Sequence, residues 1–168
     1  MSCIIDFREF KIYCAGHLPG ATSIPWSDIG QRSFELPPRH VQMDIVLPAE
    51  EAEGILIKEF LSRCGYSSVG TVHVGFDPER MVEVGNQSRI CWKASPLLAS
   101  VVEDIERGLE EAGIPKPFRA IDIGCGAGRD SVYLALRGWH VAAIDNLAVA
   151  CERVGSLARS ANVTAQVK

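Results

Sequence analysis

Residues 119–146 read RAIDIGCGAGRDSVYLALRGWHVAAIDN and combine two apolar segments with a turn rich in glycine. The first segment, 120–123, is typical of a short buried parallel strand, and the glycine turn follows at 124–128. Glycine adopts positive φ and has no Cβ, so backbone of this kind can approach a ligand closely. A helix that begins near Arg129 would add unpaired amides and the positive end of its dipole. We therefore expect a cofactor with a polar or charged tail at this turn.

A second strand in the same stretch ends on a carboxylate. Gly138 predicts the end of the helix, and residues 140–144 form the next apolar run, with Asp145 and Asn146 directly after it. A carboxylate at the end of the second strand of a βαβ unit is placed to accept hydrogen bonds from ribose hydroxyls. The order of strand, glycine turn, helix, strand and acid therefore predicts a site for a nucleoside cofactor.

The glycine spacing distinguishes two such cofactors. A dinucleotide fingerprint has its third glycine at the position of Arg129, whereas here the glycines occupy alternate positions that begin two residues after Asp122. This pattern resembles motif I of the class I S-adenosylmethionine-dependent methyltransferases, and residues 128–139 resemble its tellurite-resistance and thiopurine branch. The resemblance implies that Asp122 holds the methionine end of S-adenosylmethionine and that Asp145 binds the ribose. The full set of cofactor-binding residues that we expect is Asp122, Gly124, Cys125, Gly126, Gly128, Asp145 and Asn146. Two alternatives stay open: a dinucleotide site, and an α/β unit whose glycines serve only close packing.

The flanking sequence predicts a partial Rossmann-like parallel sheet over residues 94–168. Ser95 and Pro96 are typical of the start of a helix, here an amphipathic one whose acidic residues we expect to face solvent. Helical spacing returns at 147–161, and residues 164–168 begin a third strand. The resemblance implies further strands that supply the acceptor site, and we expect the domain to be truncated before them. We therefore assign no catalytic residue and expect this chain by itself to be inactive in methyl transfer.

The first half of the chain carries two signatures of another family. Residues 6–8 read DFR at the end of an apolar run, and residues 16–21 read GHLPGA. Together they resemble the rhodanese-like domain, which implies an α/β module over residues 1–76. The glycines and prolines predict an irregular loop at 14–25. Residues 77–93 have little periodicity and predict a linker.

The rhodanese-like signatures are not accompanied by the family's nucleophile. The family has a catalytic cysteine directly after the strand that corresponds to residues 44–47, whereas this chain continues PAEE at 48–51. Carboxylates cannot replace a thiolate nucleophile, and adjacent glutamates repel an anionic thiosulfate. Cys64 is the nearest later cysteine, at the end of a predicted helix. We therefore expect a module without sulfurtransferase activity and keep an active sulfurtransferase as the alternative; His17 is expected to pack the loop.

Composition favours none of several other classes of function, although it leaves nucleic acid open as a methyl acceptor. The chain has 168 residues, a net charge of −4 and no cluster rich in lysine or arginine, so it shows no electrostatic footprint for nucleic acid. No apolar run approaches the roughly 18 residues of a membrane helix, and no secretory signal begins the sequence, so we expect a cytoplasmic protein without a membrane segment. The cysteines lack the paired short spacings of zinc sites or disulfide frameworks. They are Cys3, Cys14, Cys64, Cys91, Cys125 and Cys151.

The partners expected from the sequence follow from its partial sheet. An uncovered strand edge invites pairing with another chain, so a homodimer or docking on a partner chain is expected. The methyl acceptor would be a small molecule or a substrate that the sequence does not identify. An alternative function is that of a regulatory interaction protein without enzymatic activity.

Overall fold

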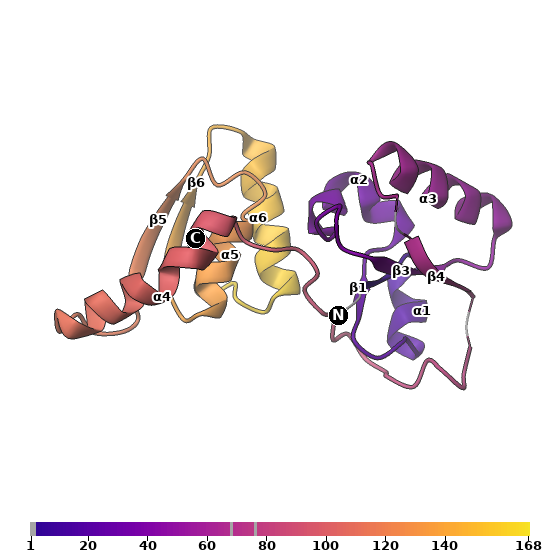
Figure 1. The fold of residues 1–168 in the computed structure, drawn as a ribbon, viewed down its shortest axis with the longest axis horizontal. Helices are drawn as coiled ribbons and strands as arrows, with labels where there is room; N and C mark the ends of the chain where they lie inside the picture. Colours follow the sequence, from indigo (N-terminus) through magenta and orange to yellow (C-terminus); the bar gives the residue numbers. More distant parts are fainter. Residues whose placement is uncertain (1–2, 68, 76) are drawn as a thin grey trace. The chain divides into compact units, whose positions relative to one another are not determined.

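The computed structural model describes residues 3–67, 69–75 and 77–168, and it divides into two compact units, Met1–Trp92 and Lys93–Lys168 (Figure 1). Each unit combines helices with a parallel sheet, so the predicted α/β class is confirmed. Among the described residues, no helix is both long enough and apolar enough to span a bilayer.

The first unit is built on a four-stranded parallel sheet with the order β2-β1-β3-β4. Its elements along the chain are β1 (Cys3–Asp6), α1 (Phe10–Ala15), β2 (Ala21–Ser23), η1 (Trp26–Asp28), α2 (Ile29–Arg32), η2 (Ser33–Glu35), β3 (Met43–Leu47), α3 (Glu51–Arg63) and β4 (Val69–Val74). Because β2 and β3 lie on opposite sides of β1, the direction of the chain connections reverses between β1 and β3. Such a switch point at the carboxyl ends of parallel strands is the usual place for a ligand.

Alternating side chains of the central strands fill a core on each face of this sheet. Ile5 of β1 and Ile45 of β3 are fully buried with Leu61 of α3 on one face. Val46, the neighbour of Ile45, belongs to the opposite cluster with Tyr13 of α1. The period-2 pattern of a strand covered on both sides explains why β1 and β3 are nearly continuous apolar runs.

Two segments of the first unit are more ordered than the sequence predicted. The expected loop at 14–25 contains β2, which pairs with β1 in parallel. Residues 77–92, expected within a linker, pack on this unit: Met81 is buried in the cluster with Tyr13, and Glu83 forms an antiparallel bridge with His17. Glycine and proline indicate irregular backbone from local sequence, whereas β2 pairs with residues 17 positions away and Glu83 pairs with a residue 66 positions away, so local sequence did not predict these pairings.

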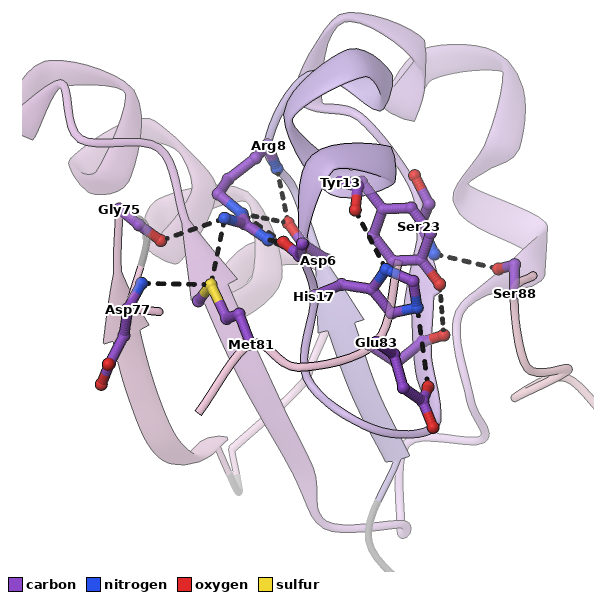
Figure 2. A network of polar contacts seen from close by, with 12 residues as sticks. Asp6, Arg8, Tyr13, His17, Ser23, Gly75, Asp77, Met81, Glu83 and Ser88 are labelled. Atoms are coloured by element: carbon purple, nitrogen blue, oxygen red, sulfur yellow. Dashed lines mark hydrogen bonds and ion pairs between the residues drawn. The ribbon is translucent and has the colours of Figure 1, made fainter. Parts of the chain in front are cut away.

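The DFR signature forms a buried ion pair at the end of β1 (Figure 2). Arg8 Nε donates to Asp6 Oδ1 at 2.9 Å and Nη2 donates to Asp6 Oδ2 at 2.5 Å, while both side chains are at most 1% exposed. The remaining donors of Arg8 reach Gly16 O, Gly75 O and Met81 Sδ. The pair therefore ties β1 to three other segments of the unit.

His17 is a packing residue, as expected. Its ring lies 3.9 Å from the Tyr13 ring with an interplanar angle of 9°, and it is 1% exposed. One ring nitrogen, Nδ1, lies 3.0 Å from Tyr13 O, and the other lies 3.6 Å from a Glu83 carboxylate oxygen (Figure 2). These contacts occupy both nitrogens within the fold.

The second unit follows the predicted order of elements closely. They are α4 (Pro96–Glu111), β5 (Arg119–Ile123), α5 (Arg129–Leu136), β6 (His140–Ile144) and α6 (Ala148–Ser160). Ser95 caps α4 by accepting a hydrogen bond from Leu98 N, and β5 pairs in parallel with β6. Val167 forms a parallel bridge with Val141, so a further strand begins to pair where the sequence predicted one.

Helices pack on one face of the β5–β6 pair and leave the other open. Val102 of α4, Leu134 of α5 and Val141 of β6 form a buried cluster on the packed face. Glu106 of α4 belongs to this packing because it accepts hydrogen bonds from Trp139 and Arg137, at 2.8 and 2.6 Å. The expectation that all acidic residues of this helix face solvent is therefore wrong at Glu106.

The open face of the pair is apolar. Ile121, Ile123 and Ile144 are 67%, 81% and 52% exposed, and the parallel register places them on the same side of the two strands. Parallel strands are normally covered on both faces. The described residues of the second unit therefore leave this apolar face uncovered.

Candidate cofactor site

The turn between β5 and α5 depends on three glycines with left-handed backbone. Gly124, Gly126 and Gly128 have φ values of 74°, 55° and 79°. The turn is closed by backbone hydrogen bonds, because Gly124 N and Cys125 N both donate to Ile144 O, at 2.7 and 3.1 Å. The end of β6 therefore holds the turn that leaves β5.

The three glycines do not serve the same purpose. A Cβ on Gly128 would lie 2.6 Å from Val154 Cγ2 and 3.1 Å from Val154 Cα, so this glycine permits the close packing of α6. A Cβ on Gly124 or Gly126 would meet nothing within 4 Å. Packing alone therefore explains Gly128 but leaves the space beside Gly124 and Gly126 open to a ligand.

Asp145 connects the second strand directly to the glycine turn. Its Oδ2 accepts a hydrogen bond from Gly126 N at 2.9 Å, and its Oδ1 accepts one from Leu147 N at 2.9 Å. These backbone donors lower the pKa of Asp145, so the carboxylate is charged at neutral pH. Because the folded pKa lies below the unfolded value, this stabilising effect is present above about pH 4 and is lost as the pH falls through the folded pKa.

The first turn of helix α5 holds the side chain of Asp122, which lies in β5 just before the glycine turn. Ser131 Oγ donates to Asp122 Oδ2 at 2.5 Å, and Ser131 is fully buried. The next acid, Asp130, accepts a hydrogen bond from Ser95 N at 2.6 Å and so connects α5 to the start of α4. Ser131 was not among the expected site residues; the signal for it is a hydroxyl placed one helical turn after the last glycine.

Cys125 and Asn146 complete the expected set. Cys125 is buried, and its burial, followed by the charges of Asp122 and Asp145, raises the pKa of its thiol. The thiol form therefore dominates, which suits a wall of the site rather than a nucleophile. Asn146 is exposed next to Asp145.

The geometry brings two carboxylates and the open backbone of Gly124 and Gly126 to one turn. Gly126 N donates a hydrogen bond to Asp145, and Asp122, just before the turn, accepts one from Ser131 just after it. Exposed backbone and two carboxylates at the start of a helix suit a ligand that carries both hydroxyl groups and charge. Within the described part of the chain, no group of three or more His, Cys, Asp or Glu side chains could hold a metal ion.

Comparison with known proteins places this site within a methyltransferase family match. Residues 101–167 match the family model of the tellurite resistance protein TehB, and they contain all seven expected site residues. The TehB family consists of methyltransferases that depend on S-adenosylmethionine, so the match supports a methyltransferase portion in the second unit.

A longer relative resembles the chain across both units. The uncharacterized protein UNK4.09 of Schizosaccharomyces pombe is 24% identical over 169 residues, which cover 91% of this chain and 49% of the relative. Since neither unit accounts for 91% of the chain, the similarity extends into both. The chain spans about half the length of this relative.

The difference between the glycines generates a stability prediction. Gly128→Ala should destabilise the second unit by about 2–5 kcal/mol, because a left-handed residue with a Cβ costs about 1–2 kcal/mol and overpacking against Val154 adds about 1–3 kcal/mol. Gly138→Ala is the matched control, since Gly138 has φ of 88° but no atom within 4 Å of its added Cβ. Urea unfolding measures both variants. Equal losses would contradict the packing role of Gly128.

Proposed function

We propose that this chain is the S-adenosylmethionine-binding portion of a methyltransferase. The observation that carries the proposal is the hydrogen bond from Gly126 N to Asp145 Oδ2, which brings the acid after β6 to the open side of the glycine turn. In this proposal Asp145 accepts hydrogen bonds from the ribose, and Asp122 orients the methionine end. Gly124 and Gly126 line the cofactor, Gly128 ends the turn beside it where it packs on Val154, and Cys125 and Asn146 are its neighbours.

The residues of the turn also favour this cofactor over a dinucleotide. A dinucleotide site uses a third glycine where its helix packs closely on the strand and the pyrophosphate meets the helix. That position is Arg129 here, and the glycine one residue earlier, Gly128, packs against Val154 of α6 rather than against a strand. The family match over 101–167 supports the same choice.

The role proposed for the chain is to hold and orient the cofactor. S-adenosylmethionine would supply an activated methyl group: a small-molecule or still unidentified acceptor attacks the methyl carbon directly, the bond from that carbon to sulfur breaks, and S-adenosylhomocysteine leaves. Alignment of the two reactants is the main source of acceleration in such a reaction, so a fixed cofactor geometry matters more than an acid or base. Asp145 fixes the turn through the amide of Gly126 and is itself held by the amide of Leu147, and Ser131 fixes Asp122. We assign no catalytic residue.

We propose in addition that the first unit is a rhodanese-like module without sulfurtransferase activity. The loop after β3 carries Pro48, Ala49 and Glu50, and none of the described residues that line the cavity beside it is a cysteine. Cys64 follows the last residue of α3, a helix of 13 residues and about 20 Å, so it lies far from this loop.

A second candidate function is that of an interaction protein. The exposed apolar face of Ile121, Ile123 and Ile144 favours it, because a parallel sheet leaves such a face uncovered only at a cost in hydrophobic free energy. We propose a second copy of the chain as the partner. The same face on each copy then covers the other.

Titration calorimetry with S-adenosylhomocysteine tests the cofactor assignment. We expect saturable binding to the full chain, and Asp145→Ala should weaken it at least about tenfold, since hydrogen bonds to a charged acceptor contribute about 1.5–3 kcal/mol. Asp104→Ala, which removes an exposed carboxylate of α4, is the control and should change binding little. NADH binding as strong as that of S-adenosylhomocysteine would overturn the assignment.

The proposed inactivity of the first unit is tested with a sulfur donor. Incubation with thiosulfate and cyanide should give no thiocyanate above the uncatalysed rate, because no thiolate is placed at the end of β3. Mass spectrometry should show no persulfide on any cysteine. An adduct on Cys64 together with turnover that disappears in Cys64→Ser would prove the module active.

Multi-angle light scattering tests the second candidate function. The wild-type chain is expected to show twice the monomer mass at high concentration. Ile121→Ser with Ile123→Ser should return it to the monomer mass, whereas Ile55→Ser, an exposed isoleucine of α3, should not. A monomer at every concentration would remove the support for an interaction protein.

A further inference from the structure

A cavity of about 530 Å³ lies at the carboxyl ends of the strands of the first unit. Segments that follow all four strands line it: Phe7 and Glu9 after β1, Trp26 after β2, Glu50 after β3 and Gly75 after β4. The cavity therefore lies where the chain connections reverse between β1 and β3, the usual ligand position in an open parallel sheet. Its size is that of a small-molecule site.

Backbone hydrogen bonds fix the segments around this cavity. Phe7 N donates to Val46 O at 2.9 Å, Trp26 N donates to Phe7 O at 3.0 Å, and Gly75 N donates to Leu47 O at 2.9 Å. These bonds join the ends of β1 and β3 to the segments after β2 and β4. The cavity is therefore formed before any ligand arrives.

The one cation that lines the cavity among the described residues has no donor left for a ligand. Arg8 has five N–H donors, and the structure pairs it with both Asp6 oxygens, Gly16 O, Gly75 O and Met81 Sδ (Figure 2). The charge of Arg8 is balanced by Asp6, which is fully buried. An anion in the cavity would therefore find neither a free guanidinium donor nor a net positive charge.

The carboxylates around the cavity differ from Arg8 because they are exposed and have no ion-pair partner in the described part of the chain. Glu9, Glu50 and Glu53 line it and are exposed, and the structure gives none of them an ion-pair partner among the residues it describes. Trp26 adds a half-buried indole held edge-to-face against Phe60, at 5.7 Å between ring centroids and 71°. Carboxylates beside an aromatic ring attract a cation through both charge and the ring quadrupole.

We propose that this cavity binds an alkylguanidinium group. The cavity accommodates an aliphatic stem against Phe7 and Trp26, while the cationic head faces the carboxylates of Glu50 and Glu53. A planar guanidinium matches a carboxylate through two parallel hydrogen bonds and stacks on an aromatic ring, which a compact ammonium does less well. The group can belong to a free small molecule or to an arginine side chain of a protein.

Titration calorimetry of the full chain with n-butylguanidinium at low salt tests this proposal. We expect saturable binding, with n-butylurea, its uncharged analogue, up to about fivefold weaker because an exposed ion pair contributes up to about 1 kcal/mol. Glu53→Gln should weaken n-butylguanidinium by a similar factor. Glu51→Gln is the matched control, since Glu51 lies in the same first turn of α3 but does not line the cavity.

A peptide distinguishes the two sources of the group. Tighter binding of acetyl-Gly-Arg-Gly-amide than of n-butylguanidinium supports a protein arginine, and weaker binding supports a free small molecule. Saturable binding of neither probe overturns the proposal. Equal weakening by Glu51→Gln and Glu53→Gln overturns it as well, because the effect would then be one of general charge, and so does binding of thiosulfate in place of the cation.

Discussion

The hydrogen bond between Gly126 N and Asp145 Oδ2 is the interaction on which the second unit's site depends. Left-handed glycines form a turn with little stability of its own, since glycine loses much backbone freedom on folding. The turn persists because the end of β6 accepts its amides, two at Ile144 O and one at Asp145. Asp145, which we propose binds the ribose, therefore also fixes the backbone that faces the cofactor.

Local signals predicted the second unit well. The apolar run at 140–144 is β6, and the cap and proline at Ser95 and Pro96 begin α4. Gly128 and Gly138 lie just before and just after α5, as their positive φ requires. Each of these features depends on a residue and its close neighbours along the chain, and for that reason the sequence alone contains them.

Features that depend on distant partners were not predictable in this way. In the sequence, Glu106 is typical of a solvent-facing acid on a helix. In the fold it accepts hydrogen bonds from Arg137 and Trp139, which follow α5. The segment 77–92 has the composition of a linker, yet Met81 supplies a contact for the buried guanidinium of Arg8 and a part of the core. The hydrogen bond between Ser131 and Asp122 joins a helix to a strand, so a motif pattern read along the chain did not include it.

The two units show how the carboxyl end of a parallel sheet can be given different chemistry. In the second unit, the amides of Gly124, Cys125 and Gly126 are bonded to the end of β6, so the open side of the turn offers glycine backbone without side chains and the charged Asp145. In the first unit, the donors of Arg8 are bonded to Asp6, Met81 and the backbone, so this guanidinium stabilises the fold and offers no donor to an anion. The loop after β3 then decides what the cavity attracts. With Glu50 in that loop, charge favours a cation where a cysteine loop would hold an anion.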